Sequence, residues 1–267
     1  MNIVVFDTET TSLEKPFCYN IGYVIVDTEH DKVLLKREYV VEQIWHNLPL
    51  FTTAYYAEKR PLYIARMRSR QCVMEKFGYI CMQMRRDFKE FSVNSAYAYN
   101  SPFDDKVFSF NCDWFKCINP FDEIPIFDIR GYVHQFIVND DYKAFCDKNG
   151  LYTESGNYST TAEALFRYIS LNTEFEEEHT ALSDSLIEAD ILSYAVSCGA
   201  SYGTEYPIMR SIKKEVERTL EFETREKEKF FFKFKSIYGG GGMPYVPPAH
   251  THDNTRLGQH ARKNAPL

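Results

Sequence analysis

The chain has 267 residues, of which 44% are hydrophobic and 16% aromatic, so it can bury a sizeable core and is not globally disordered. Its 31 Lys and Arg residues against 38 Asp and Glu give a formal net charge of −7. This charge argues against a protein that coats nucleic acid through bulk attraction, but it does not exclude nucleic acid bound at one local patch.

The seven cysteines are odd in number and no pair has the spacing CxxC, so neither a disulfide framework nor a zinc ribbon is predicted. The sequence opens without the features of a secretory signal, and no apolar run approaches the ~18 residues of a membrane span. We therefore expect a cytoplasmic protein with reduced thiols and no membrane partner (host cytoplasm if the source is viral).

The predicted elements begin with three strands joined in part by a hairpin turn, followed by helices that alternate with short strands. The strands are expected at 2–8, 18–27, 32–40, 95–99 and 124–128. The helices are expected at 61–91, from about Pro102 onward, from 129 to about 138, at 160–170 and at 181–196. Strands first and then alternation indicate an α/β fold with a mixed sheet flanked by helices.

Beyond about residue 200 the character of the sequence changes. Residues 201–238 form a charged amphipathic extension, expected to be helical, and 239–267 begin with four glycines and are predicted to be a flexible tail. The core is therefore expected within residues 1–200.

Two acidic residues end the first predicted strand. Asp7 and Glu9 are two positions apart, so their side chains share one face of the strand. Like charges at this spacing repel each other unless a cation lies between them, although a strand that runs out into a solvated loop has the same sequence.

A second polar group follows the strand at 95–99. Asn100 and Asp104 lie where that strand meets a helix, the end at which α/β sheets place their sites. An Asp in the first turn of a helix is also favourable on its own, because it interacts with the helix dipole.

The third group opens the last predicted helix of the core. Asp184 falls on an apolar side of that helix and is expected to be partly buried, so it needs a partner or a metal. His179 is five residues earlier and is expected on the preceding loop, above a site anchored by Asp184. A surface His followed by a helix N-terminal Asp would give the same pattern.

In this order, Asp-x-Glu, Asn-x-x-Phe-Asp and His-x4-Asp resemble the motifs of the DEDDh 3′–5′ exonucleases, the DnaQ-like and RNase T-like enzymes of the ribonuclease H-like superfamily. The resemblance covers about residues 1–198 and implies a ribonuclease H-like fold. It does not extend to the long basic helical stretch at about 56–91, which we expect to be an insertion in that fold. It departs from the family at Ser12, where many members have Gly.

The resemblance implies four metal-binding carboxylates and a histidine general base. The carboxylates are Asp7, Glu9, Asp104 and Asp184, and the base is His179; Asp105 adjoins Asp104, but the motif spacing selects Asp104. Hard oxygen ligands suit two Mg²⁺ ions, with Mn²⁺ able to substitute, and two such ions can activate water and stabilise the departing 3′ oxygen. The unperturbed pKa of His, near ~6.5, suits a base at neutral pH.

The expected reaction removes nucleoside monophosphates from the 3′ end of single-stranded DNA. Four residues are expected to contact the substrate or support the site: Thr10, Leu13, Asn100 and Phe103. Residues 56–90 hold nine Lys or Arg against four Asp or Glu and are a candidate track for the strand, with a solvated helix face as the alternative.

Two alternatives to a DNA exonuclease stay open from the sequence. One is a 3′–5′ RNA exonuclease of the RNase T or oligoribonuclease kind, because no motif decides whether the site uses the 2′-hydroxyl. The other is a replication accessory protein that mainly binds a polymerase, for which the aromatic and basic segment 208–235 is the candidate docking element.

Overall fold

A computed structural model of the protein describes residues 1–208. Most of the predicted extension at 201–238 and all of the predicted tail at 239–267 lie outside the described residues, as does nearly all of the candidate docking segment. Within the part that is described, no helix is both long and apolar enough to cross a bilayer.

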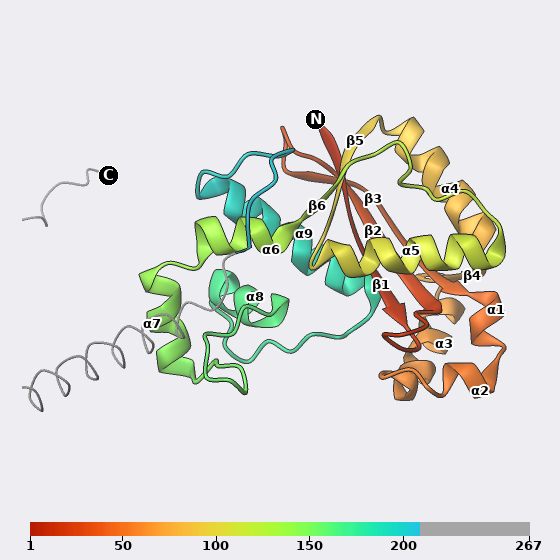
Figure 1. The fold of residues 1–267 in the computed structure, drawn as a ribbon, viewed down its shortest axis with the longest axis horizontal. Helices are drawn as coiled ribbons and strands as arrows, with labels where there is room; N and C mark the ends of the chain where they lie inside the picture. The colour runs from red at the N-terminus through yellow and green to blue at the C-terminus, as the bar shows by residue number, and fades with distance from the viewer. Residues whose placement is uncertain (209–267) are drawn as a thin grey trace, which may run out of the picture. The chain divides into compact units, whose positions relative to one another are not determined.

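One six-stranded mixed sheet organises the described chain (Figure 1). The strand order is β4-β3-β2-β1-β5-β6. The first three strands form an antiparallel meander, β5 and β6 run parallel to β1, and β4 runs parallel to β3. The strands are β1 (Asn2–Thr10), β2 (Cys18–Asp27), β3 (Lys32–Val41), β4 (Val73–Glu75), β5 (Val93–Ala98) and β6 (Ile126–Asp128). The prediction of a mixed sheet flanked by helices is confirmed.

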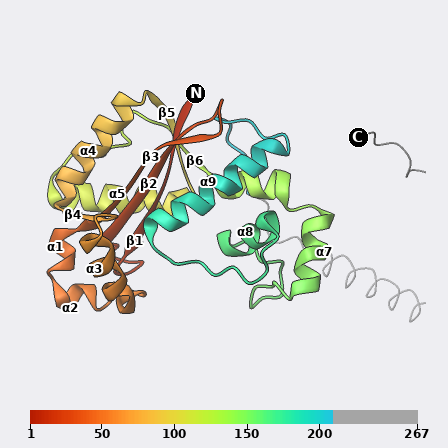
Figure 2. The ribbon, with the colours of Figure 1, turned by 180° about the vertical axis from the view of Figure 1, so that it is seen from behind.

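Helices cover both faces of this sheet, with α4 and α5 on one face and α9 across the other (Figures 1 and 2). The helices of the first half of the chain are α1 (Glu42–Trp45), α2 (Leu48–Phe51), η1 (Ala57–Lys59), α3 (Arg60–Arg68), α4 (Phe77–Glu90) and α5 (Ser101–Phe115). Those of the second half are α6 (Ile129–Tyr132), η2 (Val133–Ile137), α7 (Asp140–Asn149), α8 (Ala162–Ser170) and α9 (Ala181–Ser197).

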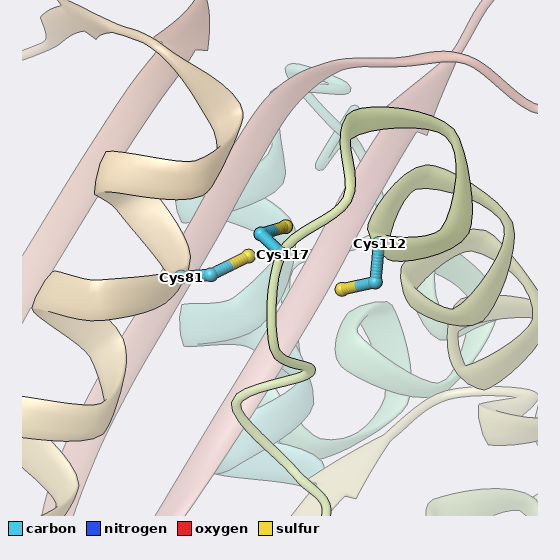
Figure 3. A group of neighbouring side chains, drawn as sticks. All are labelled: Cys81, Cys112 and Cys117. Carbon is cyan, nitrogen blue, oxygen red and sulfur yellow. The ribbon is translucent and has the colours of Figure 1, made fainter.

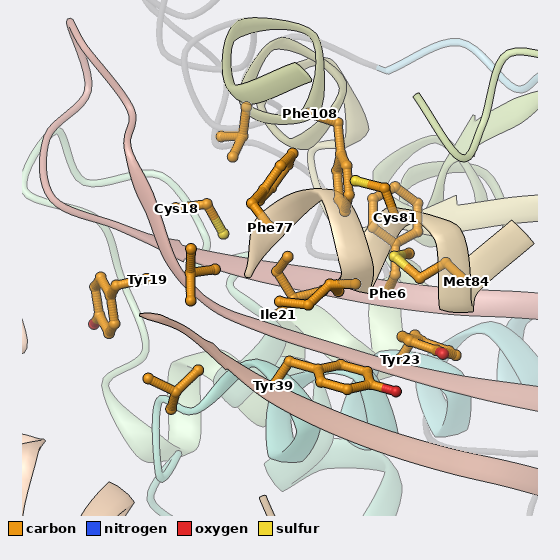
Figure 4. Packing of buried hydrophobic residues seen from close by; sticks show 14 of the residues in the cluster. Phe6, Cys18, Tyr19, Ile21, Tyr23, Tyr39, Phe77, Cys81, Met84 and Phe108 are labelled. Atoms are coloured by element: carbon orange, nitrogen blue, oxygen red, sulfur yellow. The ribbon is translucent and has the colours of Figure 1, made fainter. Parts of the chain in front are cut away.

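The strand β1 contributes to two separate cores because its side chains alternate between the two faces. Val4 and Phe6 pack under α4 and α5, in the aromatic core drawn in Figure 4. Ile3 and Val5 pack against the buried side of α9. This alternation continues past the apolar part of the strand, so it decides on which face the acidic residues that follow will lie.

The prediction of one helix over residues 61–91 is wrong. This stretch forms α3, the short strand β4 and α4. The chain leaves the helical conformation at Arg70, whose φ is +61°, and Val73–Glu75 then pair with Tyr39–Val41 of β3. Residues 73–75 form a strand because they can pair with β3, which is distant in the sequence. Helix propensity depends on the local sequence alone and does not reflect such pairing.

Candidate active site

Two acidic side chains lie on the α9 face of β1. Asp7 and Glu9 continue the series of Ile3 and Val5, and they pair across the sheet with Gly22 and Asn20 of β2. The intervening residue, Thr8, points to the face that carries α5. The two-residue period of the strand puts both carboxylates on one face, as the sequence predicted, and the structure shows that this face carries α9.

The helix α9 supplies a third carboxylate to the same place. Carboxylate oxygens of Asp7, Glu9 and Asp184 all lie within 4.8 Å of one another. The first turn of α9 can approach this closely because residue 22 is glycine: a Cβ there would lie 2.1 Å from the backbone carbon of Ala181. Because Gly22 of β2 has no side chain, α9 can pack close enough to the sheet to place Asp184 beside Asp7 and Glu9.

Hydrogen bonds fix the start of α9 on the sheet. The backbone N–H of Ala181 donates to the side-chain oxygen of Asn20 at 2.8 Å, and the hydroxyl of Ser185 donates to the carbonyl of Gly22 at 3.1 Å. Asn20 is fully buried and also accepts a hydrogen bond from the Tyr63 hydroxyl at 3.0 Å. Because Asn20 satisfies a backbone donor of the first turn, it acts as an anchor for the helix that carries Asp184.

Asp104 is outside this group of three and lies on the other face of the sheet, from where its charge acts on Asp7. It lies in the first turn of α5, is buried, and accepts a hydrogen bond from the Thr8 hydroxyl at 2.6 Å. Burial raises the pKa of Asp104 to about 7, against the opposing effect of that hydrogen bond. The neighbouring Asp105 is exposed, so the structure places Asp104 and not Asp105 beside the strand.

The carboxylates perturb one another strongly. Burial and then the charge of Asp104 raise the pKa of Asp7, and burial followed by the charge of Asp184 raises the pKa of Glu9. Burial also raises the pKa of Asp184, to about 6. Ionising all of these groups together requires positive charge between them, and hard carboxylate oxygens are the donors that Mg²⁺ and Mn²⁺ prefer. The residues present therefore fit a divalent cation.

A fifth carboxylate, Glu188, belongs to this cluster and was not predicted. It lies on α9 one turn beyond Asp184, is only 3% exposed, and accepts a hydrogen bond from the backbone N–H of Tyr99 at 3.2 Å. Burial and the charges of Asp104 and Asp184 raise its pKa well above the ordinary value. The signal in the sequence was a Glu four positions after Asp184, which puts both on one helix face.

His179 lies on the loop before α9, as predicted, and its ring is held on one side by Tyr56. The two rings stack with centroids 4.5 Å apart and planes 12° from parallel, while Nδ1 of His179 lies 3.5 Å from Glu177. The backbone of His179 is in the left-handed region, at φ +50°. Partial burial and then the charge of Lys59 lower the pKa of His179, which favours the neutral ring that a general base requires.

Residues 56–66 hold the His179 loop through charged contacts. Lys59 donates to the carbonyl of Glu178, and its ammonium lies 4.6 Å from the centroid of the Tyr56 ring. Arg66 of α3 pairs with Glu178 and donates to the hydroxyl of Thr180 at 3.0 Å. Part of the basic stretch predicted as a track for nucleic acid therefore lies against the candidate site, where Lys59 lowers the pKa of Glu9 and Asp184.

The residues expected to contact substrate occupy different environments. Leu13, on the loop after β1, is 73% exposed, and Thr10 is half-buried at the end of that strand. Phe103 packs in part against the aromatic core. Asn100 has a left-handed backbone at φ +66°, and its side-chain oxygen accepts a hydrogen bond from Arg130 at 2.9 Å.

No protein family model matches the sequence, and no curated protein is detectably similar to it in sequence. The fold, in contrast, is similar to solved structures. The nuclease domain of 3'hExo, a DEDDh family member, bound to rAMP, gives a TM-score of 0.52 at 14% identity, over 79% of this chain and 97% of that domain.

Two further structures illustrate the range of the similarity. A 3′-exonuclease in the structure of 3′-end specific recognition of the histone mRNA stem-loop gives a TM-score of 0.50 at 14% identity, over 78% of this chain and 93% of that one. Exonuclease I of E. coli in complex with a dA16 oligonucleotide gives 0.44 at 13% identity, and 71% of this chain spans 39% of that enzyme. The first of these, together with the 3'hExo domain, gives the assignment: the chain has the ribonuclease H-like α/β fold of the DEDDh 3′-exonucleases.

Proposed function

We propose that the protein is a metal-dependent 3′–5′ exonuclease that removes nucleoside monophosphates from single-stranded nucleic acid. The observation that carries the proposal is the convergence of Asp7, Glu9 and Asp184 within 4.8 Å, with His179 on the adjoining loop. Two parts of the chain that are far apart in the sequence contribute these groups, β1 and the start of α9 with the loop before it. The fold shared with DEDDh 3′-exonucleases supports the same proposal.

The roles of the residues follow from their positions and charges. Asp7, Glu9 and Asp184 would hold two divalent cations, with Asp104 completing the set from α5. When bound, such ions neutralise the charge of the phosphate and lower the pKa of the attacking water. His179 takes the proton of that water, because its lowered pKa keeps the ring neutral near pH 7. Tyr56 limits the rotation of the His179 ring by stacking on it.

The surroundings of the site suit the end of a single strand. Leu13 presents an apolar side chain to solvent on the loop that follows Glu9, where it can pack against a terminal base. Lys59 brings a positive charge near Glu9 and Asp184, where it attracts the phosphate backbone. Tyr55, which is 84% exposed next to Tyr56, offers a further stacking surface.

The kind of sugar in the substrate separates two candidates. DNA is the substrate expected from the sequence, whereas the likeness to an exonuclease that recognises a histone mRNA stem-loop favours RNA. The two candidates predict opposite rankings for matched oligonucleotides, so the question is answered in the same experiment that tests the activity.

The test uses full-length protein and 5′-labelled single-stranded DNA and RNA of one sequence, with Mg²⁺, Mn²⁺ or EDTA. We expect a ladder that shortens from the 3′ end, depends on the metal and is lost in EDTA. Faster degradation of DNA supports the DNA exonuclease, and faster degradation of RNA replaces it with the second candidate. Absence of any shortening with both ions would refute the proposal.

Neighbouring aspartates provide a matched pair of variants for the site itself. Asp104→Asn can still accept the Thr8 hydrogen bond but loses the charge, and we expect a fall in rate of at least ~10²-fold. Asp105→Asn alters an exposed side chain one position along and should retain the wild-type rate. The opposite result would show that the second acidic motif has been assigned to the wrong residue.

A further inference from the structure

Three cysteines that are scattered in the sequence meet beneath the helices α4 and α5. Sulfur atoms of Cys81, Cys112 and Cys117 lie within 4.8 Å of one another (Figure 3). Cys81 and Cys112 are 1% and 6% exposed in the aromatic core, and Cys117 is partly exposed at its edge. This core is on the face of β1 opposite to Asp7 and Glu9, so the cysteines form a group separate from the carboxylate cluster.

The end of α5 explains how Cys117 returns to its neighbours. Lys116 is left-handed at φ +55°, and the N–H of Cys117 then donates to the carbonyl of Cys112 at 3.1 Å. This turn points the chain back toward α4, where Phe77 packs against Phe115 with ring centroids 5.4 Å apart. Cys112 and Cys117 are therefore neighbours in space and could bind the same ion, and Cys81 of α4 would be the third ligand.

The distances suit a bound metal ion. A Zn–S bond is about 2.3 Å, so sulfurs that share a trigonal or tetrahedral zinc lie roughly 4 Å apart. The three sulfurs reach this separation if each moves by less than about 1 Å. A disulfide would use only two of the three thiols and would have to draw their sulfurs together to about 2 Å.

We propose that Cys81, Cys112 and Cys117 bind one thiophilic cation with a filled d shell, for which Zn²⁺ is the probe. Binding replaces three S–H protons by three S–Zn bonds, releases those protons, and leaves a fourth position for a water molecule. The partly exposed Cys117 gives the ion a route to the site. The bound ion ties the middle of α4 to the C-terminal end of α5.

The surroundings can accommodate the negative charge that three thiolates leave on a divalent ion. Cys81 lines a surface pocket of about 930 Å³ whose charged residues are Arg85, Arg86 and Lys89 against Asp122 and Glu123, so the basic residues outnumber the acidic ones by one.

The experiment uses full-length reduced protein that carries Asp7→Asn and Asp184→Asn, so that the carboxylate cluster does not compete for metal. We titrate it with Co²⁺ and expect one equivalent to produce an intense near-ultraviolet sulfur-to-cobalt absorption, which one equivalent of Zn²⁺ then abolishes. Zn²⁺ should also raise the midpoint of thermal unfolding. Absence of the absorption from protein with native circular dichroism overturns the proposal.

The variant Cys117→Ser removes the most exposed ligand with the least disturbance of the core. It should fold, lose the absorption, and no longer be stabilised by Zn²⁺. The control Cys198→Ser removes an exposed thiol outside the group and should bind as the parent protein does. Full cobalt absorption in Cys117→Ser, or a disulfide between any two of the three cysteines in protein purified without reductant but with Zn²⁺, would contradict the metal site.

Discussion

Gly22 is the residue that brings α9 to the acidic end of β1, and Gly22→Ala tests this directly. A Cβ at position 22 would lie 2.1 Å from the backbone of both Ala181 and Leu182, whereas ordinary contacts are 3.4 Å or longer. The obstacle is backbone and cannot rotate away, so the start of α9 must retreat by roughly 1.3 Å. Asp184 is in this first turn and would move with it, away from Asp7 and Glu9.

A displacement of about 1 Å in a catalytic group can cost ~10²-fold in rate, and overpacking of this kind costs about 1–3 kcal/mol of stability. We therefore expect kcat/KM to fall by at least that factor and the concentration of Mg²⁺ for half-maximal activity to rise. Oligonucleotide shortening is followed over a Mg²⁺ titration, alongside urea unfolding. Gly78→Ala, whose new Cβ meets only Cys117 at 3.4 Å, is the control: it should leave activity unchanged and should not lower stability, because alanine is the better helix former in α4. Wild-type activity and stability in Gly22→Ala would refute the account of how Asp184 is positioned.

Three other substitutions probe the base and the charge of the site. Tyr56→Ala removes a ring stack worth ~0.5–1.5 kcal/mol and should lower kcat by about 2- to 10-fold. Tyr56→Phe keeps the stack and should leave kcat unchanged. Equal losses of kcat in both variants would implicate the Tyr56 hydroxyl instead of the stack. Lys59→Met should move the acid limb of the pH–rate profile to higher pH. The reason is that the charge of Lys59 lowers the pKa of His179, Glu9 and Asp184, each of which acts in its unprotonated form. An acid limb that stays in place would exclude this electrostatic role of Lys59. Glu188→Gln should make the protein more stable in EDTA, by an amount that vanishes near pH 4 and grows as the pH rises above about 5. The reason is that the pKa of Glu188 is raised in the folded state. Once the pH is high enough for Glu188 to lose its proton in the unfolded chain, this carboxyl destabilises the folded state. Thermal unfolding of wild type and variant across this pH range gives the difference, and a gap that does not depend on pH would mean that the charge of Glu188 is not the cause.

Elements with strong local patterns were predictable from the sequence. The three N-terminal strands, the helix that contains Pro102 in its first turn and the helix that begins near Ala181 all lie where they were expected. The short elements between residues 42 and 59 were not predicted, because helices of three or four residues carry too little periodicity to identify. The ten-residue helix α7 was also not predicted. The strand β4 was mistaken for helix because its formation depends on pairing with β3.

For the candidate site, the sequence identified residues whose own spacing carries chemistry. Asp7 and Glu9 share a face by the period of a strand, and the structure brings Asp184 to them. The residues that position these groups could not be found in this way. Gly22 matters because of a helix packed on it from 160 residues away, and Asn20 because of one hydrogen bond to that helix. Such roles depend on tertiary contacts and leave no local pattern.

The group of three cysteines could not be predicted from the sequence either, because it too depends on tertiary contacts. Their spacing predicts neither a disulfide framework nor a zinc ribbon, because a sequence motif can report only ligands that are close together along the chain. A left-handed residue at position 116 and the packing of α4 on α5 create the group from residues 81, 112 and 117.

The net charge of −7 is a poor guide to whether the chain can bind nucleic acid, because it averages over groups in different places. Five acids form one electrostatic cluster: carboxylate oxygens of Asp7, Glu9 and Asp184 lie within 4.8 Å of one another, and the charges of Asp104 and Glu188 act on Asp7. Burial and then repulsion within the cluster raise the pKa values of Asp7, Glu9 and Glu188, and burial raises those of Asp104 and Asp184. The cluster therefore favours either protons or bound cations, and two divalent ions would cancel most of its charge. Lys59 and Arg66 lie beside it, on the segment that holds the His179 loop. A phosphate that approaches the metal-loaded site would therefore meet far less negative charge than the composition of the whole chain indicates.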